Sequence, residues 1–265
     1  MRLLYPSPYR ELSAPGALAV RRLHYGPGSS RWAELRLPPA DGVAAAPVVT
    51  LVHGGFWKRA WHADLMNALA VWLARQGLAT WNVEYRRVGI RGGEGAACVG
   101  DVVAAVDSLG SLAGDAPLDA SRTVLVGHSA GGHLALLAAG RAARPPRGVV
   151  GLAAVSDLVG AAQAQLGDSA AQALLGGEPA ALAERYRANS PIERLPLRTP
   201  QLLVHGVRDQ AVPVSMSSLY AKRALASGDD VELDILPDAG HPELIDPATP
   251  VWVERVLPWI QDRLR

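Results

Sequence analysis

A serine stands between glycines in the run GHSAG at residues 127–131, which fits the pattern Gly-x-Ser-x-Gly. The apolar run TVLVG at residues 123–127 leads into this serine, and the Ala- and Leu-rich segment at residues 130–141 follows it. This order predicts a strand, a tight turn and a helix, which is the context that exposes a nucleophilic serine above a sheet. A helix N-terminus beside the serine would also favour developing negative charge. We therefore expect Ser129 to be a nucleophile; the alternative is a passive serine that caps a helix.

A second motif, HGGFW at residues 53–57, directly follows the apolar run PVVTLV. An acyl-transfer enzyme must stabilise an oxyanion, and preorganised backbone N–H groups do this well. Two adjacent glycines let the backbone pass close to a substrate carbonyl. We expect N–H donors from Gly55 or Phe56, joined by the N–H of Ala130. The alternative is an ordinary loop between a strand and a helix, because Gly-Gly pairs are frequent.

An acid and a base follow later in the chain, each after a segment that is predicted to be a strand. Asp209 follows QLLVHG, and His241 follows VELDILP. Catalytic groups of open parallel sheets collect at the carboxyl ends of their strands. A neutral imidazole can take the serine proton, while a carboxylate holds the imidazole in the correct tautomer. The order Ser129, Asp209, His241 thus predicts a catalytic triad.

The other histidines are weaker candidates for the base because of their positions. His205 lies within a predicted strand, His24 lies in the N-terminal edge, and His62 follows the oxyanion loop. His128 and His133 flank the serine in sequence, which directs their side chains away from its exposed tip.

Asp209 has three competitors for the role of the acid. Asp157 ends the apolar run GLAAVS, and Asp234 and Asp238 lie near His241 in the sequence. We expect Asp157 to cap the following helix or to hydrogen-bond within its loop, with contact to substrate as the alternative.

Aromatic residues next to the oxyanion motif suggest a binding pocket. We expect Trp57 and His128 to contact substrate, and Trp57, Trp61 and His62 to line an aromatic leaving-group pocket. Core packing is an equal alternative for Trp61. The run NVEYR at residues 82–86 is expected to brace the oxyanion loop rather than to react. Bulky rings close to the reacting carbonyl predict a preference for short acyl groups on aromatic alcohols or amines.

The remaining sequence predicts the scaffold that would position these residues. Two strand-like segments at residues 18–26 and 31–38 come first, and short apolar runs then alternate with segments of helical spacing. This alternation predicts a mostly parallel sheet with helices on both faces, and the two leading strands predict an antiparallel edge. Residues 157–200 interrupt the alternation with short helical pieces, which indicates a small helical cap. We expect one α/β domain over residues 1–265, with 157–200 as an insertion.

Composition and charge argue against several other classes of protein. The 265 residues carry a formal net charge of +1, which indicates no basic surface for nucleic acid or an anionic membrane. Cys98, the single cysteine, lies among apolar residues and is expected to be a buried small side chain in a helix. Asp101, on the same helix, is expected to be solvated. No apolar run reaches the ~20 residues of a membrane helix, and residues 1–16 lack a signal-peptide core, so we expect a cytoplasmic protein.

The motifs HGGFW, NVEYRR, GHSAGGH, HGVRD and AGH, in this order, are similar to those of α/β-hydrolase esterases in the hormone-sensitive-lipase neighbourhood. Within that neighbourhood the chain looks most like bacterial kynurenine-formamidase-like hydrolases, because it has His-Gly-Gly-x-Trp rather than His-Gly-Gly-Gly. The resemblance covers residue 47 to the C-terminus. It implies an α/β-hydrolase fold, the triad and oxyanion-hole residues named above, and no metal or organic cofactor.

Three functions follow from this sequence. The first is a serine carboxylesterase that cleaves short-acyl esters through an acyl-enzyme intermediate. The second is an arylformamidase, because a formyl group is the smallest acyl group and needs the same machinery. The third is a non-catalytic ligand-binding protein on a hydrolase scaffold, which would predict a lost serine or histidine. The expected partner is a small-molecule ester or aryl amide, and a homodimer is left open.

Overall fold

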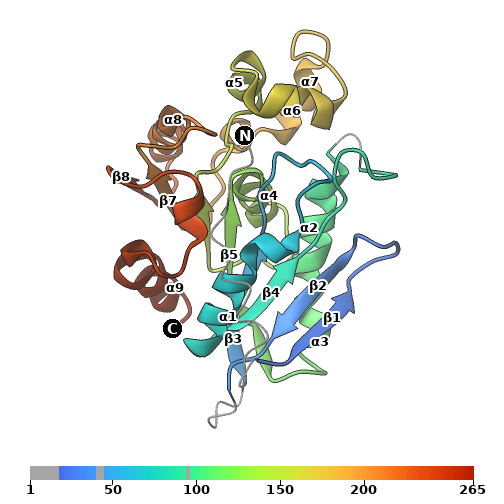
Figure 1. The fold of residues 1–265 in the computed structure, drawn as a ribbon, viewed down its shortest axis with the longest axis vertical. Coiled ribbons are helices and arrows are strands. Elements are labelled where there is room, and N and C mark those ends of the chain that lie inside the picture. Colours follow the sequence, from blue (N-terminus) through green and yellow to red (C-terminus); the bar gives the residue numbers. More distant parts are fainter. Residues whose placement is uncertain (1–17, 40–44, 94–95) are drawn as a thin grey trace.

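The computed structural model describes residues 18–39, 45–93 and 96–265. An eight-stranded sheet runs through them in the strand order β1-β2-β4-β3-β5-β6-β7-β8 (Figure 1). The pairs β1–β2 and β2–β4 are antiparallel, and every other neighbouring pair is parallel. This confirms the predicted sheet with its antiparallel N-terminal edge. The strands are β1 Val20–His24, β2 Trp32–Arg36, β3 Ala46–Val52, β4 Ala79–Val83, β5 Leu118–His128, β6 Gly148–Leu152, β7 Gln201–Gly206 and β8 Val231–Leu236.

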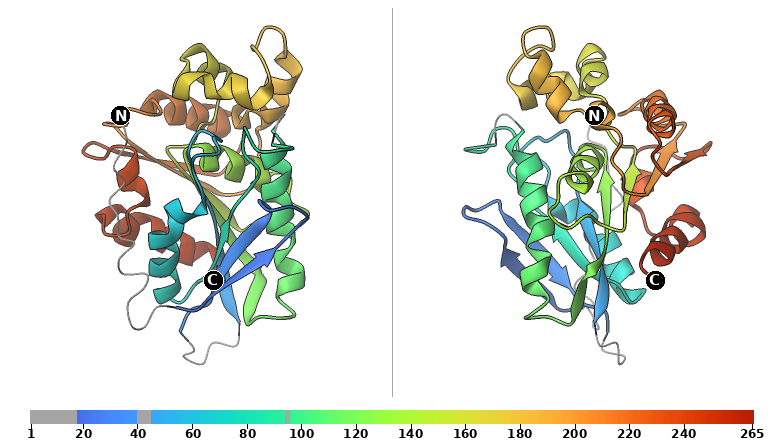
Figure 2. Two further views of the ribbon diagram at one scale, coloured as in Figure 1. Left: turned by 45° about the vertical axis from the view of Figure 1, so that its right-hand side comes forward. Right: turned by 180° about the vertical axis from the view of Figure 1, so that it is seen from behind.

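Helices cover both faces of the sheet, as Figure 2 shows. Apolar residues of α1 and α9 pack on one face, and those of α2, α4 and α8 pack on the other. Each face is therefore buried, which explains why the parallel strands read as continuous apolar runs. The helices are η2 Ala63–Met66, α1 Asn67–Arg75, α2 Ala97–Asp107, α3 Leu109–Leu112, α4 Ala130–Ala139, α5 Leu158–Gln163, α6 Leu166–Leu175, α7 Ala183–Asn189, η3 Pro191–Arg194, α8 Val214–Ala226, η4 Pro242–Ile245, the π-helical η5 Trp252–Val256 and α9 Leu257–Arg263.

Burial of the strands falls from the centre of the sheet to the edge strand β8. Every residue of β6 and β7 is buried, whereas β8, which pairs only with β7, is partly exposed along its whole length. The central strand β5 lies between β3 and β6 and is buried from Thr123 to His128. The strand that leads into the serine motif is thus buried where it approaches Ser129, and the strand that precedes His241 is the least covered of the parallel set.

The predicted cap consists of α5, α6, α7 and η3, and it lies over the carboxyl ends of the strands (Figure 1). At its start, the side chain of Asp157 accepts hydrogen bonds from the backbone N–H groups of Val159 at 2.9 Å and Gly160 at 3.1 Å. These bonds satisfy two N–H groups that the first turn of a helix leaves unpaired. The prediction that Asp157 caps the first cap helix is therefore confirmed.

Two side chains of α2 test the expected environment of that helix. Cys98 is buried as predicted, and burial raises the pKa of its thiol to about 12. The expectation that Asp101 is solvated is wrong, because its carboxylate is only 2% exposed. It accepts hydrogen bonds from the backbone N–H and Nε of Arg86, at 3.0 and 2.8 Å, and pairs with Nε of Arg31 at 3.0 Å. Both arginines come from segments distant in sequence, so helical spacing alone did not reveal them.

The expected absence of a signal peptide concerns residues 1–16, which lie outside the described residues. Within the part of the chain that the structure describes, no helix is both long enough and apolar enough to cross a bilayer.

Candidate active site

The loops that carry the predicted site residues all begin at the carboxyl ends of parallel strands. The HGGFW motif follows β3, Ser129 follows β5, Asp209 lies beyond β7, and His241 lies beyond β8. The cap covers these carboxyl ends (Figure 1). The topology thus gathers at one edge residues that are far apart in the sequence, as expected for open α/β sheets.

Ser129 occupies a strained turn between β5 and α4. Its backbone has φ 57° and ψ −120°, a conformation that non-glycine residues rarely adopt. The N–H of Ser129 donates to the carbonyl of Leu152 on β6 at 2.8 Å, and its carbonyl accepts from the N–H of His133 at 3.1 Å. These bonds to the neighbouring strand and to the first turn of α4 hold the turn in place. The predicted strand–turn–helix context is therefore confirmed.

Glycines allow this turn to pack against the loop after β3. A Cβ at Gly127 would lie 2.2 Å from the carbonyl oxygen of Gly131, and a Cβ at Gly131 would lie 2.1 Å from that of Val52. A Cβ at Gly54 would lie 3.0 Å from the Cβ of Ser129. The glycine-rich loop therefore passes directly beside the serine, at a distance that a larger residue would prevent.

Replacing Gly131 with alanine is expected to destabilise the protein by about 1–3 kcal/mol, because the new methyl group would force the β3 backbone aside. Gly100 provides a matched control, since it also lies in a helix but a Cβ there would have no neighbour within 4 Å. Gly100→Ala should instead stabilise the fold by about 0.5–1 kcal/mol through helix propensity. Thermal and urea unfolding of both variants would check this; equal stability of the two would contradict the close approach at Gly131.

The candidate oxyanion loop has an unusual backbone. Gly55, Phe56 and Trp57 have consecutive positive φ values of 107°, 51° and 56°. A Cβ at Gly55 would lie 2.3 Å from the side chain of Trp61, so the half-buried ring of Trp61 lies over this loop. Ala130 begins helix α4 on the other side of Ser129. The assignment of Gly55, Phe56 and Ala130 as oxyanion donors stays a prediction, and they lie on the two segments that flank the serine.

A buried carboxylate braces this loop, as predicted for the run at residues 82–86. Glu84, 1% exposed, accepts hydrogen bonds from the N–H groups of Ala63 at 3.2 Å and Tyr85 at 3.0 Å. Its Oε1 also lies 3.1 Å from Nε2 of His53, whose Nδ1 lies 2.8 Å from the carbonyl oxygen of Gly54. Burial raises the pKa of Glu84, but the hydrogen bond and charge of His53 outweigh it and hold the pKa below its usual value.

The structure joins the predicted acid to the predicted base. Nδ1 of His241 lies 2.6 Å from Oδ2 of Asp209. The other oxygen, Oδ1, accepts from the N–H groups of Ala211 at 2.8 Å and Val212 at 2.9 Å. Burial raises the pKa of Asp209, but hydrogen bonds from His205 and His241 outweigh it and hold the pKa far below its usual range. Asp209 is therefore a carboxylate that can orient the ring of His241.

That His128 contacts substrate stays a prediction, and the structure shows where its ring packs. Its side chain is 1% exposed, and its Nε2 donates to the carbonyl oxygen of His241 at 3.0 Å. The two rings are in contact, with centroids 4.4 Å apart. Burial, and next the neighbouring His241, lower the pKa of His128 well below its usual value, so it acts as a neutral donor. His128 thus supports the loop that carries His241, because it lies on a strand whose side chains point into the protein.

That Trp57 lines a leaving-group pocket also stays a prediction. Its ring is 1% exposed and meets the ring of His133 edge-on, with centroids 5.1 Å apart and an interplanar angle of 82°. Phe56, half-buried, points instead toward the cap, since a Cβ at Gly167 would lie 2.5 Å from its Cγ. His62 is exposed, and its Nδ1 lies 2.8 Å from a guanidinium nitrogen of Arg87. Phe56 and Trp61 are therefore more accessible than Trp57 among the aromatic residues of this region.

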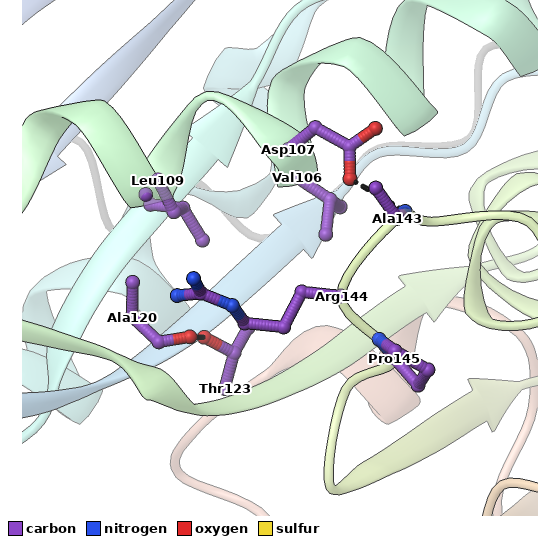
Figure 3. Close-up of a pocket in the computed structure, with 9 residues that line it drawn as sticks. Val106, Asp107, Leu109, Ala120, Thr123, Ala143, Arg144 and Pro145 are labelled. Atoms are coloured by element: carbon purple, nitrogen blue, oxygen red, sulfur yellow. Dashed lines mark hydrogen bonds between the residues drawn. The ribbon is translucent and has the colours of Figure 1, made fainter.

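Two cavities differ in their relation to the site. One, of about 430 Å³, borders His241 and lies between the loops after β7 and β8; it is lined by Arg208, Gln210, Ala211, Asp238, Gly240, His241, Pro242 and Glu243. The other, of about 210 Å³, lies beside the first half of β5, away from the carboxyl ends of the strands. The side chain of Arg144 extends across it toward Leu109 and Ala120 (Figure 3). Only the first contains a predicted site residue.

Among the described residues, no group of three or more His, Cys, Asp or Glu side chains is arranged to hold a metal ion.

Solved structures share the whole architecture of this chain. A bifunctional GH43-CE protein from Bacteroides eggerthii has a TM-score of 0.80 and 19% identity; the match covers 93% of this chain but only 35% of that protein. A truncated carbohydrate esterase from gut microbiota has a TM-score of 0.79 and 18% identity, over 94% of this chain and 98% of that one. Esterase B from Lactobacillus rhamnosis, inhibited by a tributyrin phosphonate, has a TM-score of 0.79 and 21% identity, over 96% and 88%. These likenesses show the α/β-hydrolase fold.

No curated protein matches the chain in sequence. A family model does match it: the BD-FAE model covers residues 34–224, from β2 to helix α8. The match takes in the glycine-rich loop, the serine turn and Asp209, and it leaves out His241. Because it spans more than half of the 265 residues, the chain belongs to the BD-FAE family.

Proposed function

We propose that this chain is a serine hydrolase that cleaves short-acyl carboxylic esters, with Ser129 as nucleophile, His241 as general base and Asp209 as the orienting acid. The observation that carries the proposal is the strained Ser129 turn at the same sheet edge as the His241–Asp209 pair, whose contact is 2.6 Å. Such a constellation serves acyl transfer on many folds. The esterases among the structural neighbours share the fold on which it is built here.

The reaction divides into two steps on the same residues. The imidazole of His241 takes the proton from Oγ of Ser129 as the oxygen attacks the ester carbonyl, and then gives it to the departing alcohol. N–H groups of Gly55 or Phe56 and of Ala130 would stabilise the oxyanion in this step. Water then attacks the acyl-serine and gives a proton to the same imidazole, which returns it to Oγ of Ser129 as the acid leaves. The carboxylate of Asp209 stabilises the imidazolium in both steps.

The enclosed position of the serine supports a short acyl group. Ser129 is 1% exposed, the ring of Trp61 covers the adjoining loop at Gly55, and the ring of Phe56 reaches Gly167 of the cap. The two rings thus occupy space beside the serine, and a long acyl chain that entered this space would have to displace them. The tributyrin phosphonate bound to esterase B from Lactobacillus rhamnosis is an acyl analogue of this short kind.

The arylformamidase alternative rested on the tryptophan of the HGGFW motif. That residue, Trp57, packs against His133 in the core and has no exposed face to offer an aryl leaving group. The motif is therefore explained by packing, and the ester reading is the better supported of the two. A panel of ester and amide substrates, described next, separates the esterase from the arylformamidase.

Hydrolysis is expected to fall steeply with acyl length. Each methylene forced into a filled pocket costs about 1–3 kcal/mol, or roughly tenfold or more in rate per step. We expect kcat/KM for p-nitrophenyl acetate to exceed that for the butyrate, and the laurate to be hydrolysed far more slowly than either. An N-formyl aryl amide and acetylated xylan complete the panel. A laurate faster than the acetate would contradict the short-acyl proposal, and a formyl amide faster than every ester would favour the arylformamidase.

A further inference from the structure

A second histidine touches the carboxylate of Asp209. His205 lies on β7, four residues before Asp209, and its side chain is fully buried. Its Nε2 lies 3.2 Å from Oδ2 of Asp209 and 3.0 Å from the carbonyl oxygen of Val212. Its Nδ1 lies 2.7 Å from Oγ of Ser217 on helix α8. The ester mechanism proposed above gives this residue no role.

The partners of His205 fix the direction of its hydrogen bonds. Nε2 faces two acceptors, a carboxylate oxygen and a carbonyl oxygen, so it must carry a proton. In the neutral tautomer that carries this proton, Nδ1 offers its lone pair, and the hydroxyl of Ser217 donates to it. The Nε2 proton bonds the carbonyl oxygen of Val212 at 3.0 Å and is shared with Oδ2 of Asp209 at 3.2 Å, so a chain of polar contacts runs from Ser217 through His205 to Asp209.

Two imidazoles lie against Oδ2 of Asp209. His241 donates to it at 2.6 Å, and His205 approaches at 3.2 Å. Oδ1 is held by two backbone N–H groups of the same turn, at 2.8 and 2.9 Å. Oδ1 has two backbone donors, and Oδ2 has His241 together with the shared Nε2 proton of His205, so rotation of the carboxylate would break at least two hydrogen bonds.

We propose that Ser217 and His205 form a positioning relay that anchors the catalytic carboxylate of Asp209 to helix α8. The expected effect of the relay on catalysis rests on the proposed serine-hydrolase function. The contacts among Ser217, His205 and Asp209 do not depend on that function. His205 touches no reacting atom and acts only through Asp209. The relay restrains Oδ2 to the position in which it meets Nδ1 of His241.

The other charged or titratable groups near Asp209 do not replace His205. His241 reaches Oδ2 from the loop after β8, and His128, from β5, contacts His241 and donates to its carbonyl. Arg208 is next to Asp209 in sequence but pairs with Asp238 at the surface. If His205 no longer donates, Oδ2 depends on His241 alone, and the buried negative charge holds a proton on that imidazole more strongly. The acidic limb of the kcat/KM profile would then move to higher pH.

Two substitutions at His205 separate its two hydrogen bonds. The amide nitrogen of glutamine stands near the position of Nε2, so His205→Gln keeps a donor for Asp209. The amide of asparagine stands near the position of Nδ1, so His205→Asn keeps a partner for Ser217 and loses the donor. Ser217→Ala removes the other end of the relay without changing a histidine.

Tyr220 offers a matched control on the same helix. Its hydroxyl donates to Oε1 of Gln201 at 2.8 Å, so it also links α8 to β7 by a buried hydrogen bond. Gln201 is the first residue of β7, at the far end of the strand from Asp209. Tyr220→Phe therefore tests the loss of an α8–β7 bond without touching the acid.

We expect His205→Asn to lower kcat/KM by about 10- to 100-fold, the loss of one hydrogen bond to a charged group. Ser217→Ala should lower it by a smaller factor, and His205→Gln should recover most of the loss. The acidic limb should move to higher pH in His205→Asn and not in Tyr220→Phe. In the proton NMR spectrum, the downfield signal of the His241 Nδ1 proton should shift in His205→Asn and Ser217→Ala, and stay in place in Tyr220→Phe.

The NMR measurement separates the two proposals. If the wild type hydrolyses no ester and the signal still responds to His205→Asn, the proposed function fails and the relay stands. If His205→Asn and His205→Gln behave alike, with an unmoved signal and pH profile, His205 is only a core residue and the relay is wrong.

Discussion

Replacing Ser129 with alanine is expected to lower kcat for ester hydrolysis by about 10⁶-fold, because triad members act as a unit and the remaining groups have nothing to activate. The fold should survive. Oγ of Ser129 is not needed for the backbone bonds that hold the turn, which join its N–H to Leu152 and its carbonyl to His133. Alanine must also adopt the positive φ of 57°, so a modest loss of stability is expected as well. Stopped-flow and steady-state assays with p-nitrophenyl acetate would measure kcat, and thermal unfolding would measure stability.

Ser156 is the matched control for this experiment. It is buried to the same 1% and follows the neighbouring strand β6, and its Oγ donates to the carbonyl of Met216 at 3.3 Å. Ser156→Ala should retain activity within a few-fold, since it removes one neutral hydrogen bond of about 0.5–1.5 kcal/mol. A fluorophosphonate should label Ser129 in the wild type and in Ser156→Ala. Labelling of another serine, with Ser129 free, would remove the central assignment.

Asp209→Asn is expected to lower kcat by about 10⁴-fold while leaving the fold intact. An asparagine of the same shape can present its NH₂ group to Nδ1 of His241, and the imidazole then adopts the wrong tautomer to accept the serine proton. The charge that stabilises the imidazolium is lost too. Because the pKa of Asp209 lies far below its usual range, the wild-type carboxylate stays ionised throughout the pH range of the assay. The pH dependence of activity in that range therefore does not report the titration of this acid.

Asp157→Asn is the control for the acid. Asp157 follows β6 much as Asp209 follows β7, but it caps helix α5 through two backbone N–H groups. Asparagine caps helices about as well as aspartate, so the change should cost little stability and little activity. If Asp157→Asn proves the more damaging of the two substitutions, the acid has been assigned to the wrong strand.

Local patterns in the sequence were enough for much of the fold. The bounds of β7 and β8 agree with the predicted segments Gln201–Gly206 and Val231–Leu236, because each is a short strand-like segment followed by turn residues. The serine turn and the pairing of Asp209 with His241 were also predictable, since parallel strands bring their carboxyl ends to one edge. These predictions needed only the order of elements along the chain.

The residues whose packing the sequence did not reveal are those whose partners lie far away in sequence. Trp57 packs against His133 on α4, and Asp101 was expected in solvent, yet Arg31 and Arg86 reach it from other elements. His205 was set aside because it lies inside a strand. A polar side chain in the fully buried run QLLVHG was itself a signal, since a buried polar group must find a partner, and the partner was Asp209.

The uneven burial of the sheet divides the candidate triad between two regions of different local stability. Ser129 follows the central strand β5, whereas His241 follows β8, which has one neighbouring strand and is partly exposed along its length. Segments with few buried contacts open at a lower free energy than the global fold, and their amide protons exchange sooner. Partial opening of β8 would carry away the base and leave the nucleophile in its folded surroundings. Loss of catalysis would then come before loss of the fold, with deuterium first entering the amides of residues 231–236.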